Sequence, residues 1–306
     1  MDPCVFVSYL PVSMCRLYGL QASHPTAATC ELLDAQNALI DQSQKDARGL
    51  ANPHGWGLAR WHDKAVACYR QVGPASESKT YRSEALALQG TSLLAHVRRA
   101  TVGTPAVENT HPFRHDTAML IHNGHIPAFD DVRPLLRDRL SDERCATIQG
   151  NTDSEHVLAL LLPLRDESPD ASPIAITRRA IQHVQTWVQD ADASVYADVS
   201  DQSFTDLETV PESVLHDTLA LNLLWFDDSG VVGSRLNRAL WRVNRTAPHV
   251  CKMCNSTHTG DAPDGYQATV LASERITAED WQPVPNGTVF QVDPQGGFHQ
   301  EPLHRS

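Results

Sequence analysis

The sequence predicts an α+β fold with antiparallel sheets, and three observations indicate this. Strand-like segments follow one another in blocks, without the regular alternation of strand and helix that is typical of a parallel sheet. Helix-like segments lie together in the middle of the chain, and a hairpin signal appears in the last third. With 306 residues, 41% of them hydrophobic, the chain can bury a sizeable core.

Strand patterns dominate the first part of the chain. "HGWGLARW" at residues 54–61 and "KAVACYRQV" at residues 64–72 alternate or run apolar in short pieces, which predicts adjacent strands. Residues 91–103, "TSLLAHVRRATVG", predict a strand that ends in a glycine turn. Residues 117–124, "TAMLIHNG", predict another strand, which enters a turn at its Asn-Gly pair.

Two helices are expected in the middle of the chain. In "TDSEHVLALLLPL", residues 152–164, apolar side chains share one face, and Thr152 or Asp153 can cap the helix. "ITRRAIQHVQTWV", residues 176–188, has the same helical spacing. The polar, proline-containing residues 165–173 between them predict a surface loop.

The last third returns to strands. In residues 218–234, "TLALNLLWFDDSGVVGS", the Asp-Asp-Ser-Gly segment lies between two apolar runs and predicts a hairpin. "YQATVLASE" at residues 266–274 and "GTVFQVD" at residues 287–293 predict further strands.

Charge and composition narrow the class of protein. The formal net charge of -12 argues against a nucleic-acid partner, because phosphate backbones repel an acidic surface. No apolar run approaches the roughly 20 residues of a membrane helix, so we expect no membrane partner. An odd, scattered set of cysteines is typical of reduced thiols, so we expect a soluble, cytoplasmic protein. The cysteines are Cys4, Cys15, Cys30, Cys68, Cys145, Cys251 and Cys254.

Short stretches with chemical side chains occur in a defined order along the chain. They are "MCRLYG" from Met14, "AHVRRATVG" from Ala95, "NTHPF" from Asn109 with "HNGHI" from His122, and "NTDSE" from Asn151. In this order they resemble the class II glutamine amidotransferases of the N-terminal-nucleophile hydrolase superfamily, in particular the stand-alone YafJ-like and EgtC-like branch.

The resemblance implies a four-layer αββα sandwich, in which two antiparallel sheets pack face to face between helices. It extends from Met14 to the predicted strand near Val292, so we expect residues 15–306 to form a single amidotransferase domain. No glycine-rich phosphate loop or dinucleotide-binding fingerprint is present, which leaves no sign of an acceptor domain. The implied reaction needs no cofactor and no metal.

Cys15 is the expected nucleophile, because a thiol attacks an amide once it is deprotonated. If Cys15 begins the mature chain, its own α-amine, with a pKa of about 7.7 to 8.0, is well placed as the general base. Inside a longer chain the same nitrogen is an amide and accepts no proton. Arg16 follows the family pattern, and its positive charge favours the thiolate. The alternative for Cys15 is a buried structural thiol.

The need for a free α-amine at Cys15 bears on the segment before it, residues 1–14. Either translation begins at Met14 and the methionine is removed, or residues 1–14 form a leader that is cleaved off. We prefer the first explanation. The segment lacks Lys and Arg and carries Asp2, so it makes a poor secretory signal.

The resemblance also implies the remaining site residues. Asn123, through its side-chain amide, and Gly124, through its backbone N–H, would form the oxyanion hole, although Asn-Gly alone also predicts a hairpin turn. Arg98 would hold the substrate α-carboxylate in bidentate fashion, and Asp153 would pair with the α-ammonium group. The alternatives are a surface arginine and a helix cap.

Neighbouring residues receive weaker assignments from the resemblance. Thr101 would add a hydrogen bond to the substrate, and His111 lies close to the site, where it organises the loop rather than acting as the base. His122 should point to the side of its strand opposite Asn123. "ASERIT" from Ala272 also resembles stand-alone members, but its residue types compel no role.

A C-x-x-C pair near the C-terminus is a weak zinc signal. Cys251 and Cys254 have His249 and His258 nearby, but no second pair lies at suitable spacing. We interpret the segment as a loop with incidental thiols.

The expected activity is the release of ammonia from glutamine through a γ-glutamyl thioester, and the partner would be a separate synthase subunit. Two alternatives remain open. The protein is a hydrolase of a small γ-glutamyl compound, or it is a non-catalytic glutamine-binding homologue in which residues 1–14 block the amine.

Overall fold

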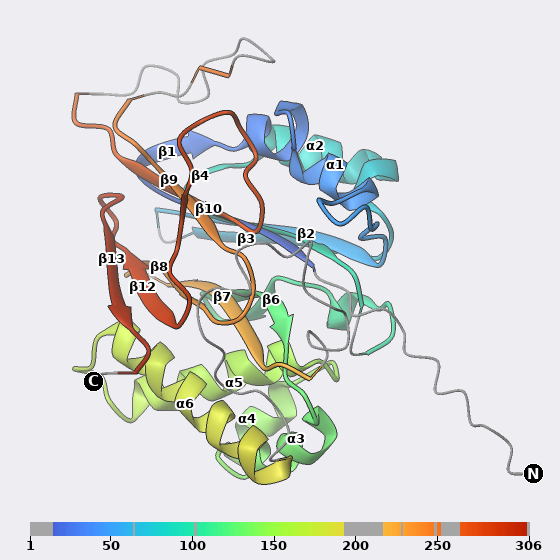
Figure 1. Cartoon of the computed structure of the whole chain (residues 1–306), viewed down its shortest axis with the longest axis vertical. Helices are drawn as coiled ribbons and strands as arrows, with labels where there is room; N and C mark the ends of the chain where they lie inside the picture. The colour runs from blue at the N-terminus through green and yellow to red at the C-terminus, as the bar shows by residue number, and fades with distance from the viewer. Residues whose placement is uncertain are drawn as a thin grey trace, which may run out of the picture.

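The structure is a computed structural model in which two antiparallel sheets stack face to face and helices cover both outer surfaces (Figure 1). This confirms the α+β fold with four layers. The described residues are 15–63, 65–100, 103–192, 217–227, 229–247, 250–251 and 264–304.

The first sheet has the strand order β11-β9-β10-β1-β4-β2-β3, and every neighbouring pair in it is antiparallel. β1 and β4 lie near its centre, so the residues at their ends are held by strands on both sides. Its strands are β1 (Arg16–Ala27), β2 (Gly55–His62), β3 (Ala65–Gln71), β4 (Gln89–Arg98), β9 (Trp241–Arg245), β10 (Ala268–Ala272) and β11 (Gln282–Pro283).

The second sheet has the order β13-β12-β8-β7-β6-β5 and is also antiparallel. β7 and β8 form the hairpin expected at the Asp-Asp-Ser-Gly segment, with Asp227 opposite Gly230. Its strands are β5 (Phe113–His115), β6 (Ala118–His125), β7 (Ala220–Asp227), β8 (Gly230–Arg235), β12 (Thr288–Val292) and β13 (Phe298–Pro302).

Helices cover the outer face of each sheet (Figure 1). The first sheet carries α1 (Leu39–Gln44) and α2 (Lys79–Ala87), together with the short turns η1 (Cys30–Asp34) and η2 (Ala75–Glu77). The second sheet carries α3 (Phe129–Arg137), α4 (Asp142–Thr147), α5 (Asp153–Asp166) and α6 (Pro173–Ala191), and η3 (Val107–Asn109) precedes β5.

The two expected helices are α5 and α6, and their ends have clear local causes. The Thr152 side chain accepts a hydrogen bond from the backbone N–H of Glu155, which caps the start of α5. Ser172 caps α6 in the same way, and Pro173 occupies the first helical position, where no N–H is needed. Almost all of α5 is buried, because leucine side chains surround the helix.

The space between the sheets is filled by side chains from the inward faces of both. They include Leu17, Leu94, Met119, Ile121 and Phe226, all fully buried. Alternate residues of these strands point to the helices instead. Central strands such as β1, β4 and β6 therefore contribute to two cores each, and they have little freedom to shift.

Two expectations about strand ends were wrong. β6 does not turn at Asn123 and Gly124 but runs on to His125, because β7 pairs with it at both positions, opposite Asn222 and Leu221. β4 ends at Arg98 rather than continuing to a glycine turn at residue 103. Asn-Gly is a hairpin signal only where no neighbouring strand continues past it.

Some expectations concern residues that the structure does not describe. These are residues 1–14, Thr101, and, in the C-x-x-C segment, His249, Cys254 and His258, whereas Cys251 is buried. Among the helices within the described ranges, none combines the length and the apolar character of a membrane span.

Candidate active site

Cys15 lies directly before β1, and its thiol contacts the residue that follows β4. The Sγ atom is 3.4 Å from both the backbone N and the backbone O of Arg99. Because β1 and β4 are antiparallel neighbours, the first residues of β1 lie beside the last residues of β4. The thiol opens into a pocket lined by Cys15, Arg98, Arg99, His111, His122, Gly124, Thr152, Asp153 and Ser154.

Burial has the largest effect on the pKa of this thiol. It raises the pKa of Cys15 above the usual 9.0, and the Arg99 backbone N–H, Arg98 and Arg16 only partly oppose this. The thiol is therefore protonated near neutral pH. A nucleophile in this position needs a base to remove its proton.

Arg98 brings a guanidinium group to the same pocket. Its side chain is buried, and Nη1 and Nη2 lie 3.4 Å and 3.3 Å from the backbone oxygens of Thr104 and Gly103. These contacts hold the plane of the guanidinium at the end of β4. Burial lowers the pKa of Arg98, whereas Cys15 and Asp153 act in the opposite direction.

Asp153 provides the carboxylate of the pocket and is the first residue of α5. Its Oδ2 accepts a hydrogen bond of 3.0 Å from the backbone N–H of Ile126, and its Oδ1 accepts one of 2.7 Å from that of Ser154. Thr152, not Asp153, caps the helix. The carboxylate also benefits from the positive end of the helix dipole.

His111 lies at the back of the pocket as a neutral ring. Burial, and then the neighbouring His96 and His122, hold the pKa of His111 well below 6.5. The centre of its ring lies 4.0 Å from that of His96, with the two ring planes tilted, and the ring meets Phe113 edge to face. Neither ring nitrogen has a hydrogen-bond partner within the described residues. A buried polar ring of this kind has hydrogen-bonding capacity left for a ligand.

His122 and Asn123 point to opposite sides of β6, as expected. His122 Nδ1 lies 2.9 Å from Ser154 Oγ on the helix side, and its Nε2 donates to the backbone oxygen of Ala220. Asn123 instead contacts Ser273 on the side of the first sheet. His122 thereby fixes the first turn of α5, which carries Asp153.

Gly124 is needed where β6 and β7 approach closely. A side chain at this position would collide with the backbone oxygen of Ala220 and with the ring of His122. Glycine therefore leaves the backbone of residue 124 uncovered, and this residue lines the pocket.

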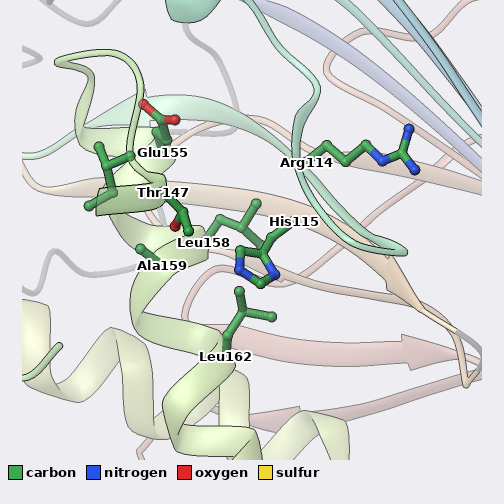
Figure 2. Close-up of a pocket in the computed structure, with 8 residues that line it drawn as sticks. Arg114, His115, Thr147, Glu155, Leu158, Ala159 and Leu162 are labelled. Atoms are coloured by element: carbon green, nitrogen blue, oxygen red, sulfur yellow. The ribbon is translucent and has the colours of Figure 1, made fainter. Parts of the chain in front are cut away.

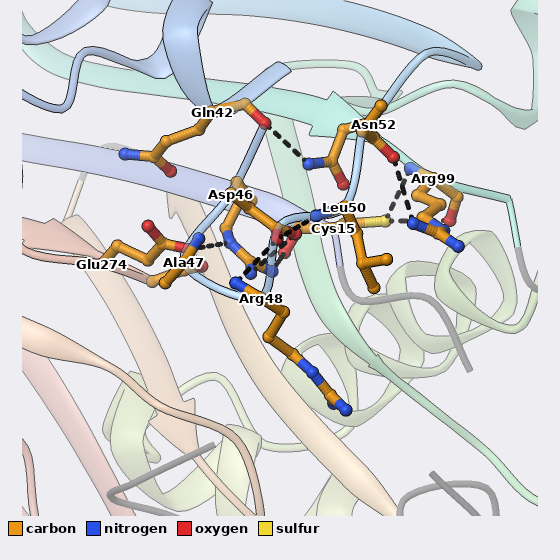
Figure 3. A network of polar contacts seen from close by, with 12 residues as sticks. Cys15, Gln42, Asp46, Ala47, Arg48, Leu50, Asn52, Arg99 and Glu274 are labelled. Atoms are coloured by element: carbon orange, nitrogen blue, oxygen red, sulfur yellow. Dashed lines mark hydrogen bonds and ion pairs between the residues drawn. The ribbon is translucent and has the colours of Figure 1, made fainter. Parts of the chain in front are cut away.

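A buried ion network holds the chain next to Cys15. Arg16 pairs with Asp46 at 2.8 Å and with Glu274, and it also donates to the backbone oxygen of Cys15. Glu274 accepts from the backbone N–H of Ala47, which ties the turn that begins at Asp46 to the same site (Figure 3). The charge of Arg16 is thus shared with two carboxylates and is a lesser influence on the thiol than burial.

A second hollow lies against α5 and β5 (Figure 2). Apolar side chains of α5 line much of it, together with Arg114, His115 and Glu155. The carboxylate of Glu155 is already bonded to the backbone N–H groups of Gln149 and Gly150. No cysteine lines this hollow, in contrast to the pocket at Cys15.

Most of the expected site residues meet in the Cys15 pocket. Asn123 is not in the lining, but its neighbour Gly124 is, and Thr101 lies outside the described residues. Sequence reasoning missed the contact of Arg99 with the thiol, and it missed Ser154. Neither had a signal in the sequence, because both act through positions that only the fold brings together.

Comparison with known proteins identifies the family. The family profile described as "Glutamine amidotransferases class-II" matches residues 14–195, which is more than half of the chain. The chain belongs to the class II glutamine amidotransferase family. It is therefore an enzyme of the amidotransferase and amidohydrolase type, and the match begins next to Cys15.

Curated relatives of this amidotransferase include a yeast protein and a mycobacterial protein. The chain is 25% identical to "Probable glutamine amidotransferase DUG3" of Saccharomyces cerevisiae, over 92% of this chain and 82% of that protein. It is 34% identical to "Gamma-glutamyl-hercynylcysteine sulfoxide hydrolase" of Mycobacterium tuberculosis, over 36% of this chain and 49% of that protein.

Solved structures support the fold. The glutamine phosphoribosylpyrophosphate amidotransferase of B. subtilis superposes with a TM-score of 0.57 at 16% identity, covering 95% of this chain and 50% of that chain. At this identity the likeness concerns the arrangement of the two sheets and their helices.

Proposed function

We propose that this amidotransferase hydrolyses the γ-amide of glutamine, or of a small γ-glutamyl compound, with the Cys15 thiol as nucleophile. The observation that carries the proposal is the pocket in which Cys15, Arg98 and Asp153 meet. A nucleophile beside one cation and one anion suits a substrate with a free amino-acid end.

Recognition follows from the two charges. The Arg98 guanidinium binds the α-carboxylate of the substrate, and the Asp153 carboxylate pairs with its α-ammonium group. His111 offers neutral ring nitrogens to the same ligand, and Thr101 adds a hydrogen bond. A peptide-linked glutamine lacks both charged groups, so the pocket rejects it.

The chemical step is acyl transfer to sulfur. The Cys15 thiolate attacks the amide carbon, and the developing oxyanion is held by the Gly124 backbone N–H and the Asn123 side-chain amide. The proton removed from the thiol passes to the leaving nitrogen, and ammonia departs. Water then cleaves the γ-glutamyl thioester, which releases glutamate and restores the thiol.

The base in this proposal is the α-amine of Cys15, so the active form begins at that residue. The raised pKa of the thiol supports this, because a protonated thiol needs a proton acceptor within reach. In a chain that retains residues 1–14 the nitrogen of Cys15 is an amide and is not basic. That form would bind substrate without turning it over.

The test is ammonia release from glutamine by protein that begins at Cys15. Activity should disappear in Cys15→Ala and persist in Cys145→Ala, a control thiol that donates to the backbone oxygen of Arg137 and does not line the pocket. Absence of ammonia release, together with no labelling of Cys15 by a glutamine-like chloroketone, would refute the proposal.

The two relatives suggest different fates for the amide nitrogen. Similarity to the mycobacterial hydrolase favours simple hydrolysis of a γ-glutamyl compound. Similarity over most of the chain to a yeast protein named as a probable glutamine amidotransferase favours transfer of the nitrogen to an acceptor. In this second case we propose that a separate synthase subunit receives the ammonia. Rapid turnover of γ-glutamyl compounds by the purified protein supports the first, and a synthase that co-purifies and raises the glutaminase rate supports the second.

A further inference from the structure

We propose that Ser273 is a positioning residue that turns the NH₂ group of Asn123 toward the pocket. This inference rests on the proposed function, because it concerns the oxyanion hole of that reaction. Ser273 follows β10 directly, and both it and Asn123 are buried, with 3% and 1% of their surface exposed.

Ser273 is fixed to the strand that begins next to the nucleophile. Its Oγ accepts a hydrogen bond of 3.0 Å from the backbone N–H of Leu17, and its own backbone N–H donates to the oxygen of Leu17. Leu17 lies two residues after Cys15. The hydroxyl of Ser273 therefore has a defined place between β1 and Asn123 of β6.

The hydrogen bonds of the hydroxyl decide the orientation of the amide. The end placed as Nδ2 of Asn123 lies 3.1 Å from Ser273 Oγ, and the end placed as Oδ1 is buried without a partner among the described residues. In that orientation the hydroxyl receives two N–H donors, and the amide oxygen is left unpaired.

In the reverse orientation, the Ser273 hydroxyl and the Asn123 side-chain oxygen both have suitable partners. The two ends of an amide have nearly the same shape, so hydrogen-bond chemistry assigns them. The Ser273 hydroxyl then accepts from Leu17 N–H and donates to the Asn123 oxygen. The NH₂ group becomes the unpaired end, and it is the donor that an oxyanion on the substrate requires.

The experiment is a double-mutant cycle in protein that begins at Cys15, with kcat for glutamine as the readout. Asn123→Ala should lower kcat by about 10²-fold to 10³-fold, as for loss of an oxyanion donor. Ser273→Ala should lower kcat by about 10-fold or more with a smaller change in KM. The double variant should be no slower than Asn123→Ala, because Ser273 acts only through Asn123.

Ser234→Ala is the matched control, since Ser234 is a buried residue whose hydroxyl bonds to the backbone of Leu221 and Leu223. It should keep the wild-type kcat. Ser273→Thr, which retains the hydroxyl, should restore most of the rate lost in Ser273→Ala. Additive losses in the double variant, or a wild-type kcat in Ser273→Ala, would overturn the role of Ser273.

Neutron diffraction of the wild-type protein gives a test that needs no variant to fold. Deuterons on the amide end that faces away from Ser273 support the proposal, and deuterons on the end that faces it refute it. A wild-type protein without glutaminase activity but with the first arrangement would refute the proposed function alone.

Discussion

At the scale of single residues, the protonation state of the Cys15 thiol controls the reactivity of the proposed nucleophile. Burial raises the pKa of Cys15, and the nearby arginines compensate only in part. The structure thus leaves the thiol dependent on a base. In the proposed mechanism this base is the α-amine of Cys15, which exists only when the chain begins at that residue.

Alkylation by iodoacetamide should report this acidity directly. In the chain that retains residues 1–14, the labelling rate of Cys15 should rise with pH to a midpoint above 9, because the thiol loses its proton only there. The denatured protein should give a midpoint of about 8.5. Peptide mass analysis after timed labelling measures both, and a folded-state midpoint below 8 would contradict the role of burial.

Asp153→Asn tests the recognition of the α-ammonium group. The amide keeps an oxygen for the backbone N–H of Ile126 but loses the charge, so kcat/KM for glutamine should fall about 10²-fold, mainly through KM. Asp142→Asn, at an exposed site in α4, is the control and should leave the kinetics unchanged. An unchanged KM in Asp153→Asn would remove Asp153 from the substrate site.

Sequence reasoning succeeded for residues that lie within motifs resembling those of the family. Cys15, Arg98 and Asp153 could be picked out by resemblance, and they do meet in one pocket. It failed for residues whose role comes from partners far away in the chain. Ser273 and Glu274 contact residues more than 200 positions earlier, and no local pattern encodes such a contact.

At the scale of elements, strands followed by clear turn or loop signals were predicted, including β8 and β10, but β1 was not. β1 was not anticipated, because it contains few polar alternations and is buried on both faces along most of its length. The turn predicted at the Asn-Gly pair was wrong for a related reason, since pairing of β6 with β7 overrides the local turn preference. Long-range pairing, which the sequence does not display, decides both cases.

A buried ion pair also connects separate elements. Arg245 at the end of β9 forms a 2.6 Å ion pair with Glu31 of η1 and a bidentate contact with Glu279. Burial acts against the charge of Arg245, yet Glu31 and Glu279 raise its pKa above the ordinary value. The Arg245 guanidinium therefore stays charged.

Glu31→Gln should lower the free energy of unfolding by about 3 kcal/mol, because it leaves a buried cation with one carboxylate fewer. Glu167→Gln, which removes only the exposed pair with Arg139, should cost less than about 1 kcal/mol. Urea unfolding followed by circular dichroism compares the two. Equal effects would mean that the buried pair contributes little.

At the scale of the whole molecule, strand order interleaves the two ends of the chain. β10, from the last 40 residues or so of the chain, lies beside β1, and β7 lies beside β6. The fold class could be predicted from the sequence because blocks of strands and helices are visible in it. The strand order could not, since it depends on which edges meet after the chain has collapsed.

The position of β10 has a practical consequence for anyone dividing the protein. The family profile ends at residue 195, but a fragment of residues 15–195 would lack the partners of β1 and β6 and would carry two bare sheet edges. Such a fragment should aggregate and be digested rapidly by trypsin, whereas residues 15–306 should resist digestion. A fragment that is monomeric and resists the protease would contradict this prediction. The segment by which the family is identified is thus expected to be too short to fold stably by itself.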